Sequence, residues 1–171
     1  DQYGADALRL TLITGNAPGN DMRFYWERVE ASRNFANKVW NASRFIMMNM
    51  QQMEAAGNGA AAKAATPDMA SLADADKWIL SKANTLCKEV TENLDKFEMG
   101  IAAQKIYDFI WEEFCDWYIE MVKPRLYGND ESSKAAAIWT LRHVLTDALK
   151  LLHPYMPFVT EEIFCTLKEM E

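Results

Sequence analysis

Residues that interrupt helices are scarce in this sequence. Its 171 residues include only 7 glycines and 5 prolines. Half of the residues are hydrophobic and 12% are aromatic, which is enough to fill a sizeable core and argues against a disordered chain. Few turn-forming residues also argue against an all-β fold, whereas the many Ala, Leu, Met, Lys and Glu residues favour helices. We therefore expect one helical domain of ordinary size.

Cysteines and long apolar runs are also scarce. Cys87, Cys115 and Cys165 never form a C-x-x-C pair, which predicts reduced thiols in the cytoplasm and no disulfide framework or zinc site. No apolar run approaches the roughly 20 residues that span a bilayer, and no secretory signal opens the chain. The net charge of −7 argues against a protein that coats nucleic acid without specificity, but it is compatible with a local basic face.

Sequence motifs of catalytic sites are absent. The chain has no G-x-G-x-x-G, no G-x-x-x-x-G-K-[ST] and no H-E-x-x-H. Neither His143 nor His153 follows a Glu by three residues, as in di-iron helix bundles, so a core or helix-end position is the simpler interpretation of both. Glu112, Asp116 and Glu120 lie four residues apart and could bind a cation, but a solvated helix face explains them more simply. We expect no metal and no catalytic residue in this chain.

Apolar residues at steps of three and four predict an all-α, antiparallel helix bundle. Ser71 and Asp74 suggest a capping box at the start of one helix. One strongly apolar stripe runs from Ile101 through Trp117 to Met121, where a helix ends near Pro124. The small, Ala-rich residues at 54–68 predict a flexible surface linker. Helices are expected at about residues 1–12, 25–50, 71–97, 101–123, 135–153 and 157–167.

One helix face stands out because its polar side carries cations and amides but no carboxylate. At about 100° per residue, six side chains between residues 33 and 44 share one arc, and the ring of Phe45 projects into the same arc. We expect the opposite arc, with Phe35, Ala36, Val39, Trp40, Ala42, Ile46 and Met47, to face the core. The candidate binding residues are Arg33, Asn34, Asn37, Lys38, Asn41, Arg44 and Phe45.

This combination of side chains suits unpaired RNA bases. Arg and Lys meet phosphates, amides meet base edges, and an aromatic ring stacks on a base for about 1–3 kcal/mol. An ordinary polar face is the competing interpretation, in which Phe45 packs under a neighbouring helix. A purely structural interaction module and an enzyme with a metal in the bundle core are further alternatives. An apolar outer face would favour the first, and bound metal would favour the second.

Four motifs in this order resemble the valyl-tRNA synthetase family of class I, in its bacterial type. They are D-Q-Y-G-A-D-A-L-R at Asp1–Arg9, R-N-F-A-N-K-V-W-N-A-S-R-F at Arg33–Phe45, F-C-D-W-Y-I-E at Phe114–Glu120 and L-H-P-Y-M-P-F-V-T-E-E-I-F at Leu152–Phe164. G-N-D-M-R-F at Gly19–Phe24 continues the first motif, and Phe164 stands where the family usually has Trp. An isoleucyl- or leucyl-type synthetase is the nearest alternative.

The resemblance implies a fold, a partner and a division of labour. Residues 1–22 would be a connector that follows the K-M-S-K-S loop of a catalytic domain, and residues 23–171 would be a helical anticodon-binding domain. Valine tRNA and the rest of the synthetase chain would be the partners of a cytoplasmic, monomeric protein. ATP with magnesium would act in the catalytic part, so the fragment would bind tRNA without catalysis. Arg9 and Arg23 are expected to pair with acids of the parent enzyme as connector residues, and contact with a tRNA stem is the alternative.

Overall fold

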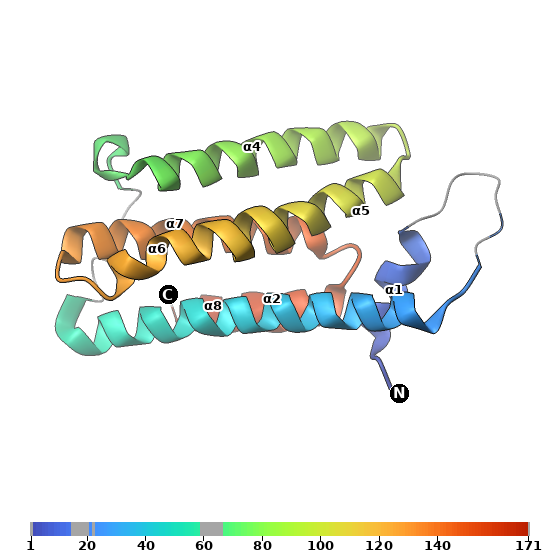
Figure 1. The fold of residues 1–171 in the computed structure, drawn as a ribbon, viewed down its shortest axis with the longest axis horizontal. Coiled ribbons are helices and arrows are strands. Elements are labelled where there is room, and N and C mark those ends of the chain that lie inside the picture. The colour runs from blue at the N-terminus through green and yellow to red at the C-terminus, as the bar shows by residue number, and fades with distance from the viewer. Residues whose placement is uncertain (1, 15–20, 22, 59–66, 171) are drawn as a thin grey trace.

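The computed structural model describes residues 2–14, 21, 23–58 and 67–170. Within these ranges every regular element is a helix, and the long helices lie side by side as antiparallel rods (Figure 1). None of the helices in the described ranges is long and apolar enough to cross a membrane. The predicted all-α helix bundle is therefore confirmed.

From residue 74 onward, successive helices follow one another with connections of no more than four residues. In Figure 1, α5, η3 and α6 continue as one rod between α4 and α2, while α7 and α8 lie behind. The helical elements in the described ranges are α1 (Ala5–Ile13), α2 (Trp26–Met53), η1 (Glu54–Asn58), η2 (Met69–Ser71), α4 (Asp74–Asp95), α5 (Met99–Asp108), η3 (Phe109–Tyr118), α6 (Ile119–Leu126), α7 (Glu131–Leu152) and α8 (Pro157–Glu169). Of the predicted linker at 54–68, residues 54–58 form a π-helical turn after α2 that is kinked at Gly57 (φ 83°), and residues 59–66 lie outside the described ranges.

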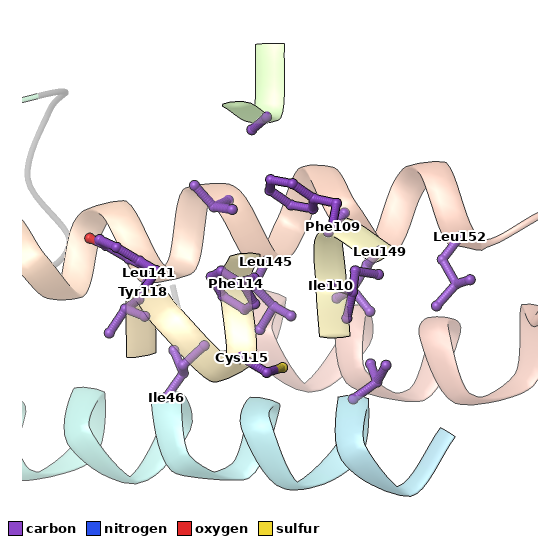
Figure 2. Close-up of a cluster of buried hydrophobic side chains, with 14 of the residues drawn as sticks. Ile46, Phe109, Ile110, Phe114, Cys115, Tyr118, Leu141, Leu145, Leu149 and Leu152 are labelled. Atoms are coloured by element: carbon purple, nitrogen blue, oxygen red, sulfur yellow. The ribbon is translucent and has the colours of Figure 1, made fainter. Parts of the chain in front are cut away.

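The core is built around α7, which contacts α2, α4, α5, α6 and α8. Leu141 and Leu149 of α7, Phe114 of η3 and Ile46 of α2 are fully buried, and Figure 2 shows these three helices contributing side chains to one apolar centre. Burial of each such side chain contributes about 1.5–3 kcal/mol to stability. The core therefore fixes the rotation of α2 and leaves one of its faces open.

The rod changes geometry at η3, which is a π-helix over ten residues. Its π-type hydrogen bonds join residues five apart, so the buried face repeats every four to five residues. Phe114, Tyr118 and Val122 are buried in steps of four, whereas Trp117 is 60% exposed and Met121 is 47% exposed. Ile101 is also 51% exposed. The predicted apolar stripe was therefore wrong for Ile101, Trp117 and Met121, which are exposed.

The start of α4 also differs from the prediction. Ser71 belongs to the turn η2, where the Asp68 carboxylate accepts a hydrogen bond from the backbone N–H of Ala70. The Asp76 carboxylate then accepts from the backbone N–H of Ala73, at 3.0 Å, just before α4 begins. The predicted capping box at Ser71 was wrong because Asp68 uses the local donors to make a separate turn.

The short helix α1 packs on α2 and is tied to the start of α8. The Asp6 carboxylate accepts from the backbone N–H of Val159 at 2.7 Å. Arg9 donates to the backbone carbonyls of Pro154, at 3.0 Å, and Tyr155, at 3.3 Å. These carbonyls take the place of the acid that Arg9 is expected to meet. The domain boundary at residue 22 stays a prediction.

Candidate nucleic-acid interface

The predicted orientation of α2 is largely confirmed. The helix contains neither Gly nor Pro over its 28 residues, and it lies along one edge of the bundle (Figure 1). Phe35, Val39 and Ile46 are buried in the core. The opposite side of the helix faces away from the other rods.

Four polar side chains form an exposed row along this side, which we name the α2 strip: Asn34, Asn37, Asn41 and Arg44. Their spacing of three, four and three residues follows the helical repeat, so the row is about 15 Å long. Within the described ranges, no side-chain hydrogen bond or ion pair engages Asn37, Asn41 or Arg44. Two amides and one guanidinium are therefore available to a ligand.

Lys38 lies beside the α2 strip but is already engaged. Its Nζ is 2.6 Å from an oxygen of Asp116 and 3.9 Å from the ring centroid of Trp111, and its side chain is only 23% exposed. The Trp111 ring in turn stacks on Tyr107, whose pKa is raised chiefly by burial. The structure places Lys38 at the predicted surface, yet as one half of an ion pair.

Phe45 is half-buried between α2 and α6. Part of its ring packs against the core, and Nζ of Lys123 lies 5.9 Å from the ring centroid. The packing interpretation is thus confirmed for part of the ring, whereas stacking on a base stays a prediction. The ring borders the α2 strip, but only part of it is open for stacking on a base.

Arg33 occupies the other border of the α2 strip, toward α1. Its guanidinium lies 5.4 Å from the ring centroid of Tyr3 and makes a 3.4 Å contact with Glu30. A weaker contact of 3.5 Å joins it to Asn34. Arg33 is therefore less available to a ligand than Arg44.

Trp40 was assigned to the core, and this assignment was wrong. Its side chain is 39% exposed. Seven residues span almost two turns of an α-helix, so Trp40 projects within about 20° of Arg33 and not opposite to it. The spacing between Arg33 and Trp40 in the sequence therefore already indicated that Trp40 is exposed. Trp40 adds an aromatic ring to the surface beside Asn37 and Arg44.

Neighbouring charges on the rod are arranged as ion pairs. Asp116 pairs with Lys38, and Glu120 pairs with Lys123 at 2.5 Å. The described residues contain no group of carboxylates, histidines and cysteines that could hold a metal ion. The acidic series is thus an exposed helix face, and two of its three members, Asp116 and Glu120, meet lysines.

The two histidines have ordinary structural surroundings. His153 ends α7, and its Nδ1 lies 2.9 Å from the Thr160 hydroxyl, as the helix-end interpretation predicts. His143 is exposed in the middle of α7, so the predicted core or helix-end position was wrong for this residue. Its ring stacks on Trp139 with ring centroids 4.8 Å apart and lies 3.6 Å from Asp147 on the same helix. Both histidines belong to α7 or its C-terminal end, so neither is part of the α2 strip.

Sequence comparison connects this geometry to known proteins. Valine–tRNA ligase of Clostridium tetani is 58% identical over an alignment of 173 positions, which covers 100% of this chain and 18% of that protein. The enzymes of Clostridium perfringens and Symbiobacterium thermophilum are 58% and 53% identical, over 98% and 96% of this chain. The chain thus spans less than a fifth of the length of these relatives, and the matches include α2.

Structure comparison finds the same fold in a methionyl-tRNA synthetase. The methionyl-tRNA synthetase of Mycobacterium tuberculosis superposes with a TM-score of 0.72, over 94% of this chain and 32% of that one, at 20% sequence identity. The family model described as the anticodon-binding domain of tRNA ligase matches residues 76–171, which is more than half of the chain. The chain therefore belongs to the family of anticodon-binding domains of tRNA ligases.

Proposed function

We propose that this chain is the anticodon-recognition module of a valine–tRNA ligase, and that the α2 strip receives the anticodon loop of valine tRNA. The family supports the type of ligand. The names of the relatives that are 53–58% identical support the amino acid. The observation that carries the location is the row of unengaged donors at Asn37, Asn41 and Arg44 on an open helix face.

The side chains of the strip divide into roles that match a single-stranded loop. Arg44 is the exposed, unpaired cation and would bind a phosphate. The amides of Asn37 and Asn41 offer both donors and acceptors, which suits base edges. Phe45 at one border and Trp40 at the other offer ring surface for stacking. Asn34 extends the row by one turn, with Arg33 behind it.

The remaining length of the relatives implies a division of labour within a longer polypeptide. In this proposal the rest of the synthetase attaches valine to tRNA with ATP and magnesium, in the cytoplasm, and this module contributes affinity and selection of the tRNA. The connector role of residues 1–22 belongs to the same proposal. Affinity of the module alone would be weak because contacts made elsewhere in the polypeptide are lost.

The location is tested by replacing the strip while leaving the core intact. We expect the triple variant Asn37→Ala, Asn41→Ala and Arg44→Ala to weaken binding of a valine anticodon stem-loop at least about tenfold, measured by fluorescence anisotropy. Loss of the amide contacts and of one phosphate contact is the cause. Circular dichroism checks that the helix content is unchanged.

A matched control comes from α4, on the far edge of the bundle (Figure 1). The variant Thr85→Ala, Lys88→Ala and Thr91→Ala removes two exposed polar side chains and one exposed cation from that helix. Binding by this control should stay within about twofold of the original protein. Equal losses in the two triple variants would remove the support for the α2 strip.

A further inference from the structure

The ion pair between Lys38 and Asp116 changes what Lys38 can bind. Its ammonium lies 2.6 Å from the carboxylate, and the Trp111 ring covers a second side at 3.9 Å from the ring centroid. The open remainder of the ammonium therefore faces any ligand together with a carboxylate that is 52% exposed. Arg44, six residues further along α2, has no such neighbour within the described ranges.

The π geometry of η3 builds this arrangement. Trp111 and Asp116 are five residues apart, and residues five apart lie one turn apart on the same face of a π-helix. In an α-helix the same two residues would point about 140° apart, so only one of them could meet Lys38. π-helical segments are common at functional sites. Here the segment places a ring and a carboxylate around one lysine of the candidate interface.

Charge then decides which of two RNA groups, a phosphate or a base edge, Lys38 can bind. A phosphate brought to Lys38 would come almost as close to Asp116 as to the ammonium, so attraction and repulsion would nearly cancel. A base edge carries no net charge and can accept the remaining ammonium hydrogens without this repulsion. Building on the proposed function, we propose that Asp116 is a specificity-determining, positioning residue that makes Lys38 a reader of base edges and not a phosphate contact.

The salt dependence of RNA binding separates these two roles. Each phosphate contact to a single strand contributes about 0.7 to the slope of log affinity against log salt concentration. We expect Arg44→Gln to lower this slope by about 0.7 and Lys38→Gln to leave it unchanged. Lys38→Gln should instead reduce, by about tenfold, the preference for the valine stem-loop over one with a substituted anticodon base.

Replacing the carboxylate should have the opposite effect on the slope. In Asp116→Asn the freed ammonium can bind phosphate, so we expect the slope to rise by about 0.7, overall affinity to rise, and base preference to fall. Asp116→Glu keeps the charge and should retain the original slope. Glu113→Gln is the matched control, because Glu113 also lies on η3 and pairs, at 2.9 Å, with a lysine of another helix, Lys82. That pair is on the α4 side, so its loss should change neither quantity.

Each result has one meaning for the proposal. An unchanged salt slope together with a lost base preference in Lys38→Gln supports the proposal. The Lys38→Gln variant tests the proposal even if Asp116→Asn fails to fold. A slope that falls in Lys38→Gln as much as in Arg44→Gln overturns it, while leaving the proposed function in place. An original protein with no preference for the valine stem-loop overturns the proposed function, and this inference with it.

Discussion

At the scale of single residues, the buried carboxylate of Asp76 joins three parts of the chain. It is fully buried and accepts hydrogen bonds from the Tyr118 hydroxyl and the Arg125 guanidinium, each at 2.7 Å, and from the backbone N–H of Ala73. A buried charge with several good donors is stable, but removal of the charge leaves the buried donors unpaired. This network holds α4 to η3 and α6.

We expect Asp76→Ala to lower the free energy of unfolding by about 3–5 kcal/mol, because Arg125 and Tyr118 lose their shared acceptor. Tyr118→Phe removes only one donor and should lower it by about 1 kcal/mol. Urea unfolding followed by circular dichroism measures both values. A loss in Asp76→Ala no larger than that in Tyr118→Phe would contradict this account of the network.

Because of Cys115, the free energy of unfolding depends on pH in the alkaline range. Burial raises the pKa of its thiol from the ordinary value of 9.0 to about 12, with Lys38 opposing the shift. The unfolded chain loses this proton at lower pH than the folded chain does. Stability is therefore unaffected below pH 9 and decreases as the pH rises from about 9 to about 12.

We expect the loss of unfolding free energy between pH 7 and pH 10 to be about 1.4 kcal/mol smaller in Cys115→Ala than in the original protein. Burial also raises the pKa of Tyr118, but this residue is present in both proteins and its effect cancels in the comparison. Urea unfolding at the two pH values provides the measurement. The same pH dependence in both proteins would show that the thiol is not protected.

At the scale of helices and turns, the sequence predicted α2 well because nothing interrupts its apolar repeat. It could not predict η3, because a π-helix arises from packing against neighbouring helices and has no simple residue pattern. This one change explains why Trp117 and Met121 are exposed, and why Trp111 and Asp116 meet the same lysine. The sequence alone therefore could not predict the partners of Lys38. It could have predicted the exposure of Trp40.

The start of α8 depends on a cap supplied by another helix. The Asp6 carboxylate accepts from the backbone N–H groups of Phe158, at 3.2 Å, and Val159, at 2.7 Å. We expect Asp6→Ala to lower the free energy of unfolding by about 1 kcal/mol, as for other lost helix caps. Asp6→Asn retains an acceptor and should lose less. Thermal unfolding of the two variants tests this order, and a reversed order would contradict the capping role.

At the scale of the whole molecule, the net charge of −7 and the polar α2 strip are consistent with local recognition. Long-range attraction of RNA is weak in such a protein, so under the proposed function selection would depend on contacts made at the strip. The fold class and the side of α2 that is exposed follow from the sequence pattern. The pairing that engages Lys38 and the half-burial of Phe45 depend on which rods lie beside α2, and only the structure shows them.

The central claim is that this chain selects valine tRNA by its anticodon. Fluorescence anisotropy with labelled stem-loops that carry valine, isoleucine and leucine anticodons, at one fixed salt concentration, tests it most directly. We predict that the valine stem-loop binds at least about tenfold more tightly than either of the others. Equal affinity for all three, or no binding to any, would contradict the claim.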